Sequence, residues 1–274
     1  MRLVSMHESF GQLANASDRE TLLRCTRPVV AQLGFDHFVY VMKVDLSPSR
    51  PSHLMLSGYP QDWVDRYSEK HYFDCDPVLA SALHSPLPVL WDKEFPPAAA
   101  QESDARQREV LEEAAAHGLS HGITLAVRGN TGFNGVLTLA RDRPLEQQGE
   151  DLINLVGSVQ ILAGIVHASM ERIDLPQAVP ELHVHLTERE RQCLQWSADG
   201  KTAWEVARIL GIRERTVIFH LNNSVTKLGA VNKTQAITKA LALGLLNLPQ
   251  RERSSALASC RPRIITGVLG PLGP

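Results

Sequence analysis

The first 180 residues combine a hydrophobic period typical of helices with one typical of strands. Apolar residues recur at helical spacing over residues 3–33 and stop at Gly34, which predicts a helical segment. β-branched and aromatic residues fill residues 37–44 and predict a strand. Helices and antiparallel strands are therefore mixed, without the βαβ alternation of a parallel sheet. The other predicted elements are a strand over 53–57, helices over 63–71 and 104–117, a hairpin of strands over 123–127 and 135–140, and a long helix over 150–173.

The long helix over residues 150–173 carries apolar residues on two sides. One side repeats at i, i+3, i+4 and i+7 and includes Leu155 and Leu162, as expected for a helix that packs on its own core. The other side mixes large and small residues, among them Ile161 and Gly164. A helix that is apolar on two sides is either fully buried or shared with a partner. Its place beside a linker favours sharing, and hence a homodimer.

A proline-containing linker is predicted after this helix. Residues 174–186 contain Pro176 and Pro180 and cannot continue the helix. The same segment holds His183 and His185, an H-x-H pair that would need further ligands to bind a metal. We therefore expect no metal site.

Four short helices with a helix-turn-helix at their centre are predicted next. Thr187 and Thr202 each precede a Glu by three residues, the capping-box pattern that starts a helix. Gly211 is the expected turn, a third helix follows over 213–228, and Asn232 caps a fourth. Arg, Thr, Asn and Lys side chains on the third helix suit phosphates and base edges.

Charge divides the chain in the same way as the hydrophobic pattern. The formal net charge is −2, yet residues 1–180 carry 15 basic and 23 acidic side chains, whereas residues 181–253 carry 11 and 7. The basic part suits an anionic partner, most commonly nucleic acid. The four cysteines are widely spaced, which favours neither disulfides nor zinc. The N-terminus lacks a basic-then-apolar leader pattern and no uninterrupted apolar run is long enough to span a bilayer, so we expect a cytoplasmic protein without membrane contact.

Four motifs within residues 186–246 point to a known DNA-binding domain. They are L-T-x-R-E, G-K-T-x-x-E-V-A, T-V-x-F-H and K-L-x-x-x-N-K, and together they closely resemble the LuxR-type regulators. The resemblance implies a helix-turn-helix over 207–226, whose third-helix residues enter the major groove of double-stranded DNA. Relatives commonly have Lys where this chain has Ile218. The residues assigned to DNA contact are Lys201, Arg213, Arg215, Thr216, His220, Asn222, Asn223, Lys227 and Lys233.

Motifs in the first 180 residues resemble the acyl-homoserine-lactone receptors of the same family. The resemblance extends to about residue 247 and implies an α+β fold. That fold is an α-β-α sandwich around an antiparallel sheet, with the ligand between sheet and helices, followed by an all-α four-helix domain. The residues that carry it are Gly58-Tyr59-Pro60, Trp63, Tyr67, Asp76-Pro77-Val78, Pro88-Val89-Leu90-Trp91 and the segment GLSHGIT over 118–124.

The resemblance also assigns roles in ligand binding. Trp63 donates its indole N–H to the lactone carbonyl, and Asp76 accepts the amide N–H of the ligand. Tyr59 donates to the amide carbonyl, with Thr138 as a second donor. Such matching is needed because burying an amide without partners costs about 2 to 7 kcal/mol. Tyr67 and Trp91 are expected to wall the pocket, and Val39, Val78, Leu79 and Leu125 to contact the acyl chain.

The expected organisation is a ligand-binding domain over 1–173, a linker over 174–186, a DNA-binding domain over 187–247 and a tail over 248–274. The tail is rich in Ser, Pro, Gly and Arg without a sustained period, so we expect it to be disordered. The predicted function is quorum-sensing transcriptional regulation by a homodimer. It would bind an N-acyl-homoserine lactone, use no cofactor, and recognise promoter DNA as an inverted repeat.

Two alternatives remain open. A solo receptor of the same family would read a small molecule other than a lactone, although Trp63 and Tyr67 argue against it. A serine hydrolase is suggested by Gly118-Leu119-Ser120-His121-Gly122, which fits the G-x-S-x-G nucleophile motif. That motif needs a strand before Ser120 and a helix after it, whereas the predicted order here is reversed. For the aromatic residues of the ligand-site motifs, such as Trp63 and Tyr67, the alternative to ligand binding is ordinary packing in the core.

Overall fold

The computed structural model describes residues 2–44, 53–92, 105–129, 133–146, 148–179 and 184–246. A five-stranded antiparallel sheet, in the order β2-β1-β5-β4-β3, forms the centre of the first part. The four strands predicted from the sequence are confirmed, and a short edge strand, β3, was not predicted. The strands are β1 (His37–Lys43), β2 (His53–Ser57), β3 (Val89–Asp92), β4 (His121–Arg128) and β5 (Asn134–Arg141).

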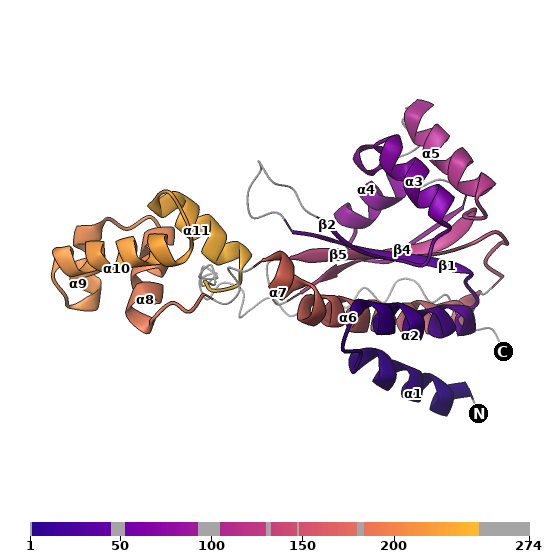
Figure 1. The fold of residues 1–274 in the computed structure, drawn as a ribbon, viewed down its shortest axis with the longest axis horizontal. Coiled ribbons are helices and arrows are strands. Elements are labelled where there is room, and N and C mark those ends of the chain that lie inside the picture. The colour runs from indigo at the N-terminus through magenta and orange to yellow at the C-terminus, as the bar shows by residue number, and fades with distance from the viewer. Residues whose placement is uncertain are drawn as a thin grey trace, which may run out of the picture.

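Helices cover both faces of the sheet, which makes the α-β-α sandwich that the sequence implied (Figure 1). α2 and α6 lie on one face, with α1 packed against them from outside, while α3, α4 and α5 cover the other face. The helices are α1 (Arg2–Ala14), α2 (Arg19–Gln32), α3 (Gln61–Glu69), α4 (Pro77–His84), α5 (Ala105–Ala116) and α6 (Gly149–Ile173).

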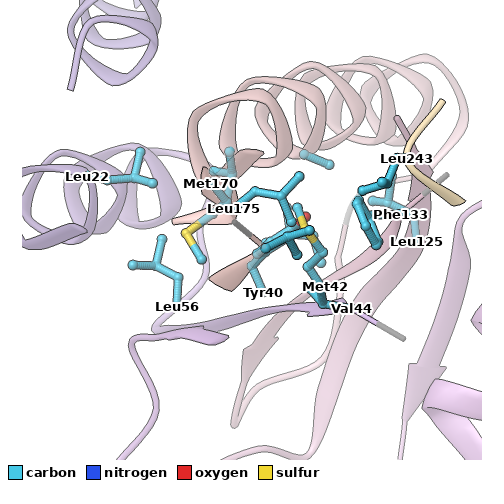
Figure 2. Packing of buried hydrophobic residues seen from close by; sticks show 14 of the residues in the cluster. Leu22, Tyr40, Met42, Val44, Leu56, Leu125, Phe133, Met170, Leu175 and Leu243 are labelled. Carbon is cyan, nitrogen blue, oxygen red and sulfur yellow. The ribbon is translucent and has the colours of Figure 1, made fainter. Parts of the chain in front are cut away.

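Side chains along β1 alternate between the two layers, because successive residues of a strand point to opposite faces. Phe38, Tyr40 and Met42 are buried in the core on the α6 side, where Figure 2 shows Tyr40 and Met42 below that helix. Val39 and Val41 are half-buried and point to the layer of α3–α5. One face of the sheet is therefore packed closely, whereas the other retains space.

Residues 3–33 form two helices and not the single helical segment that their periodicity predicted. The break lies between Ala14 and Arg19. Asp18 has extended backbone, and its carboxylate accepts the backbone N–H of Thr21 at 2.8 Å, which starts α2. The hydroxyl of Ser169 on α6 donates to the carbonyl of Leu13 at 3.2 Å and attaches α1 to the sandwich. The N-cap at Asp18 therefore starts a new helix, although the apolar pattern continues across it.

The two apolar sides of α6 have different surroundings, as their pattern predicted. Leu155 and Leu162 are buried in the core, whereas Ile153 and Ile161 are 71 % and 56 % exposed. A Cβ added at Gly157 would meet no atom within 4 Å, so this side of the helix is open. By length and composition, α6 is also the one helix among the described residues that could cross a membrane. Its contacts with the sheet and with α1 and α2 show instead a core helix of the sandwich.

The C-terminal domain contains the four predicted helices. Thr187 and Thr202 form the two expected capping boxes, with hydrogen bonds in both directions to Glu190 and Glu205. Gly211 ends α9 with a left-handed φ of 66°, a backbone conformation that favours glycine. The helices are α8 (Glu188–Ala198), α9 (Ala203–Leu210), α10 (Glu214–Lys227) and α11 (Lys233–Ala242).

The segment between the two domains begins with a helical turn. α7 (Leu175–Ala178) places Pro176 in its first turn, where the missing N–H of proline leaves no bond unmade. The rest of the linker includes residues 180–183, which lie outside the described residues, as does the tail over 248–274. Beyond the end of α11, Leu243 is buried, and Figure 2 shows it beside Phe133 of the first domain. The two domains therefore share an apolar contact.

Candidate ligand cavity and DNA-binding surface

A cavity of about 380 Å³ lies between the sheet and helices α3, α4 and α5. Most of its wall is apolar, and a few polar groups converge on it, which is the usual form of a small-molecule site. Nine of the ten ligand contacts expected from the sequence line this cavity: Val39, Tyr59, Trp63, Tyr67, Asp76, Val78, Leu79, Trp91 and Thr138.

Leu125 is the exception, and its predicted place in the cavity wall needs correction. It pairs with Leu137 across β4 and β5, and both residues belong to one buried cluster; Figure 2 shows Leu125 in the core on the α6 side. Thr124, one residue earlier, pairs with Thr138 on the cavity side. A shift of one residue along a strand reverses the face, so a motif match without the register cannot place such a side chain.

Several wall residues were not predicted. Strand alternation could have found Val41 and Val136, because each lies two residues from a predicted contact on the same strand. The apolar side of α5 is a weaker signal, since it fits any core helix equally well. The cavity residues that sequence reasoning missed are Val41, His53, Met55, Val64, Ser68, His71, Phe73, Asp74, Val110, Leu111, Ala114, Leu119 and Val136.

Asp76 holds a structural and a ligand-facing position at once. Its Oδ1 accepts the backbone N–H groups of Val78 at 2.8 Å and Leu79 at 3.1 Å, which starts α4. Its Oδ2 accepts the hydroxyl of Tyr67 at 2.8 Å. Burial raises the pKa of Asp76 above its ordinary value of 3.8, although these hydrogen bonds oppose the shift. A carboxylate offers about four lone pairs, so one acceptor position remains for a donor in the cavity.

Tyrosine and tryptophan rings form the end of the cavity around Asp76. Trp63 is 2 % exposed and meets Tyr67 edge-on, with 5.6 Å between ring centroids. Burial, with a smaller contribution from the charge of Asp76, raises the pKa of both Tyr59 and Tyr67. Both hydroxyls therefore stay protonated at neutral pH; Tyr67 donates its proton to Asp76, so of the two the Tyr59 hydroxyl remains as a donor to a ligand. An indole N–H is likewise a donor, so this end of the cavity suits carbonyl oxygens.

A chain of hydrogen bonds beneath the cavity has a fixed direction. The indole N–H of Trp91 donates to the hydroxyl of Thr124 at 2.9 Å, and Thr124 lies 3.0 Å from the hydroxyl of Thr138. The Thr124 oxygen accepts from the indole, which can only donate, and the Thr124 hydroxyl in turn donates to Thr138. Thr138 accepts that hydrogen bond and lines the cavity, so its own hydroxyl proton is available to an acceptor there.

Ion pairs join α3 to α5 above the cavity. The guanidinium of Arg66 binds Glu113 through two hydrogen bonds of 2.8 and 2.7 Å. Those bonds lower the pKa of Glu113 to about 2. Lys70 and Glu109 add a second pair at 3.2 Å. These contacts hold the two helices that carry Trp63 and Leu111 together over the ligand space.

The polar side of α10 is presented to solvent. Arg215 and Asn222 are exposed, together with Ile218 at 45 % and Phe219 at 58 %. Val217, Leu221 and Leu228 are buried and pack α10 against α8 and α9. The outward residues are therefore free of the domain core, as a groove-binding helix requires.

Lys227 differs from the other basic residues assigned to DNA. Its Nζ lies 2.7 Å from Glu190 and also donates to the carbonyl of His185 at 3.3 Å. Glu190 is buried, yet hydrogen bonds from Lys227 and Thr187 lower its pKa despite that burial. Lys227 thus joins α10 to the start of α8. Lys201, by comparison, lies 3.8 Å from Asp199 near the start of α9.

The structure gives no support to hydrolase or metal chemistry in the motifs considered. Ser120 lies after α5 and before β4, the reverse of a nucleophile elbow, and its hydroxyl donates to Asp142 at 2.7 Å. Its side chain is buried, with 1 % of the residue exposed. Among the described residues, which include His185 but not His183, no cluster of His, Cys, Asp or Glu could hold a metal ion.

A small-molecule cavity in an α-β-α domain, joined to a helix-turn-helix domain, defines a ligand-responsive DNA-binding protein. The family described as "Autoinducer binding domain" matches residues 18–170, and "Bacterial regulatory proteins, luxR family" matches residues 184–240. The chain belongs to the LuxR family of quorum-sensing transcriptional regulators, which are not enzymes.

Individual relatives agree with this assignment. The transcriptional activator protein SolR of Ralstonia nicotianae is 36 % identical over 87 % of this chain and 98 % of its own length. SdiA in complex with octanoyl-rac-glycerol superposes with a TM-score of 0.71 at 27 % identity, covering 89 % of this chain and 96 % of that one. CepR2 of Burkholderia cenocepacia, described as N-acylhomoserine lactone dependent, gives a TM-score of 0.51 at 25 % identity, covering 61 % and 93 %.

Proposed function

We propose that the cavity binds an N-acyl-homoserine lactone. This proposal is supported by the placement of one hydrogen-bond acceptor and several donors of the protein around a single apolar space. Asp76 would accept the ligand amide N–H, while Tyr59 and Thr138 would donate to the amide carbonyl and Trp63 to the lactone carbonyl. Each polar atom of the ligand then has a partner, which burial of an amide requires.

The acyl chain would lie along the apolar part of the wall. Val39, Val78 and Leu79 contribute to it, and Tyr67 and Trp91 would close the space around the ring. Of the ten contacts expected from the sequence, Leu125 is left out of this proposal because it faces α6. CepR2, which its title describes as lactone dependent, supports the lactone as ligand class.

A second ligand class is supported by one comparison. SdiA is described in complex with octanoyl-rac-glycerol, which has an acyl chain and an ester carbonyl but no amide N–H. Such a ligand would use the donors Trp63, Tyr59 and Thr138, and one of its free glycerol hydroxyls would donate to Asp76 in place of the amide N–H. The role of Asp76 as acceptor of an amide N–H is therefore tested with a ligand that has no donor at that position.

The test is calorimetry with the purified full-length protein and two ligands of equal chain length, an acyl-homoserine lactone and the matching ester of α-hydroxy-γ-butyrolactone, in which an ester oxygen replaces the amide N–H. Preference for the lactone that disappears in Asp76→Asn would support the lactone proposal. Equal affinity for both ligands, unaffected by this substitution, would contradict it. Mass spectrometry of an organic extract of the protein identifies the ligand carried from the cell.

The exposed side of α6 is proposed as a homodimer interface. Ile153, Gly157, Ile161 and Gly164 follow one another along this side, and the two glycines leave room for the close approach of a second helix. A two-fold dimer presents two recognition helices, so the DNA site would be an inverted repeat with half-sites about 10 bp apart.

DNA contact is proposed for the residues on and beside α10. Arg215, Asn222 and Asn223 would read base edges, and Lys201 and Lys233 would bind phosphates. The same proposal assigns backbone or edge contacts to Arg213, Thr216, His220 and Lys227, although Lys227 acts partly by positioning α10. Because its target is promoter DNA, we place the protein in the cytoplasm, with a ligand-binding domain over 1–173, a linker over 174–186 and a DNA-binding domain over 187–247.

A further inference from the structure

A second cavity of about 250 Å³ continues the first one towards the DNA-binding domain. Both cavities are lined by Val41, Phe73, Leu79 and Val136. These four side chains therefore surround the passage from one cavity to the other. Since all four are apolar, the passage between the two spaces is apolar as well.

Strand register shows in which direction the second cavity lies. β1 and β5 pair Val39 with Thr138, Val41 with Val136, and Lys43 with Asn134. The first pair borders the polar end of the ligand site, the second pair belongs to both cavities, and the third lines the second cavity. Four residues of β5, about 13 Å at ~3.3 Å per residue, separate the Thr138 donor from Asn134. The second cavity thus lies on the path of an extended tail that leaves the amide group.

Helix α4 lines the same path on the opposite side. Leu79 belongs to both cavities, and Leu83, one turn later, lines the second. Leu83 is 48 % exposed although it is a large apolar side chain. An apolar occupant of the second cavity would cover it.

The DNA-binding domain supplies the far wall of the second cavity. Ala242, the last residue of α11, lines it together with Phe133. The next residue, Leu243, is buried and lies beside Phe133 (Figure 2). A molecule that fills this space therefore touches both domains.

We propose that the second cavity holds the distal end of a long acyl tail, which thereby contacts the DNA-binding domain directly. The inference rests on the proposed lactone function and adds a site to it. A short tail ends in the first cavity, whereas a long tail reaches Ala242. The contact couples tail length to the position of α11, and such coupling is reciprocal: DNA binding then changes the affinity for long-tailed ligands by the same factor.

The test measures the affinity of the full-length protein for butanoyl- and dodecanoyl-homoserine lactone by calorimetry. Ala242→Leu and Leu83→Trp fill the second cavity from its two sides. Both should weaken dodecanoyl binding on the order of tenfold or more, because several methylenes lose their place, and should leave butanoyl binding within about twofold. Thr238→Leu is the matched control, since Thr238 is exposed on the same helix and does not line the cavity.

The outcomes separate this inference from the function on which it rests. If the wild type binds both lactones but the two variants change neither affinity, or change both equally, the second cavity is not the tail site. If the wild type binds neither lactone, the proposed function fails and this inference fails with it. Leu83→Trp lies outside the DNA-binding domain, so agreement between the two variants excludes a folding defect of α11 as the cause.

Discussion

The hydroxyl of Tyr67 donates a hydrogen bond of 2.8 Å to Oδ2 of Asp76, while Oδ1 of the same carboxylate caps α4. One side chain thus fixes the start of a helix, orients a tyrosine of the cavity wall and offers an acceptor to the ligand. Substitutions of Asp76 must separate these roles to be informative.

Asp76→Asn should fold and bind a lactone about tenfold more weakly. Asn caps a helix about as well as Asp, so α4 keeps its start. A hydrogen bond to a charged acceptor contributes about 1.5–3 kcal/mol, against about 0.5–1.5 for a neutral one, and ~1.4 kcal/mol is tenfold in affinity. Calorimetry measures the change. Asp62→Asn, at an exposed position of α3, should behave as wild type, and Asp76→Ala should also lose folded protein because the cap is removed.

Lactone binding should release protons in mildly acidic solution. The folded-state pKa of Asp76 is raised above 3.8 by burial, so the folded protein binds more protons than the unfolded chain just above that pH. Asp76 therefore contributes less stability as pH rises through its folded pKa. A ligand N–H favours the charged carboxylate and lowers this pKa again. Calorimetry in buffers of different ionisation enthalpy should show the release, and Asp76→Asn should abolish it.

Thr124→Val should weaken both the fold and the site. The substitution leaves the buried N–H of Trp91 without its acceptor and Thr138 without its donor. A buried group left unsatisfied costs about 1–3 kcal/mol, which urea unfolding can measure. Ligand affinity should fall as well, and Thr124→Ser should restore both properties. If the valine variant binds lactone like the wild type, Thr138 does not depend on this chain for its orientation.

Ile161→Glu should convert the dimer to monomer. A charge placed in an apolar interface without a partner costs about 3 kcal/mol or more, roughly 100-fold in the dissociation constant. Sedimentation equilibrium of the ligand-bound protein reports the change. Gln32→Glu adds the same charge at an exposed position of α2, away from the exposed side of α6, and serves as control. A wild-type protein that remains monomeric at every concentration would remove the basis for this interface.

Arg215, Lys201 and Ile218 should differ in their effects on DNA binding. Arg215→Ala should cost about 1–3 kcal/mol and relax the preference at one base position, whereas Lys201→Ala should weaken all sequences alike and reduce the salt dependence. Ile218→Lys should tighten binding without changing the preferred site, because Ile218 is 45 % exposed and can be replaced by a longer cation. Gel shifts on specific and scrambled duplexes at two salt concentrations decide among these outcomes.

Local patterns were sufficient for most elements and for most of the cavity wall. The two capping boxes at Thr187 and Thr202 and the two-sided pattern of α6 depend on residues close in sequence, and the structure confirms them. The short edge strand β3 was missed because four residues show too little alternation. The break before α2 was missed because the periodicity of residues 3–33 hid the cap at Asp18.

Features that depend on strand register, or on contacts between residues far apart in the chain, could not be predicted from the sequence. Leu125 was assigned to the wrong face because its motif gave no pairing partner, which only β5 supplies. The interaction of Lys227 with Glu190 joins residues 37 positions apart, so the polar pattern of α10 could not reveal it. The contact of Ala242 with the second cavity joins two domains and has no local signal at all.

The alternation of β1 between the two layers has an evolutionary consequence. Val39 and Val41 meet the ligand space, while Tyr40 between them meets His167 on the helix proposed to hold the dimer. Mutations at odd-numbered positions of this strand can therefore alter which signal is perceived without touching the packing behind it. Such a receptor can evolve to recognise a different ligand while the packing that supports its proposed dimer interface is conserved.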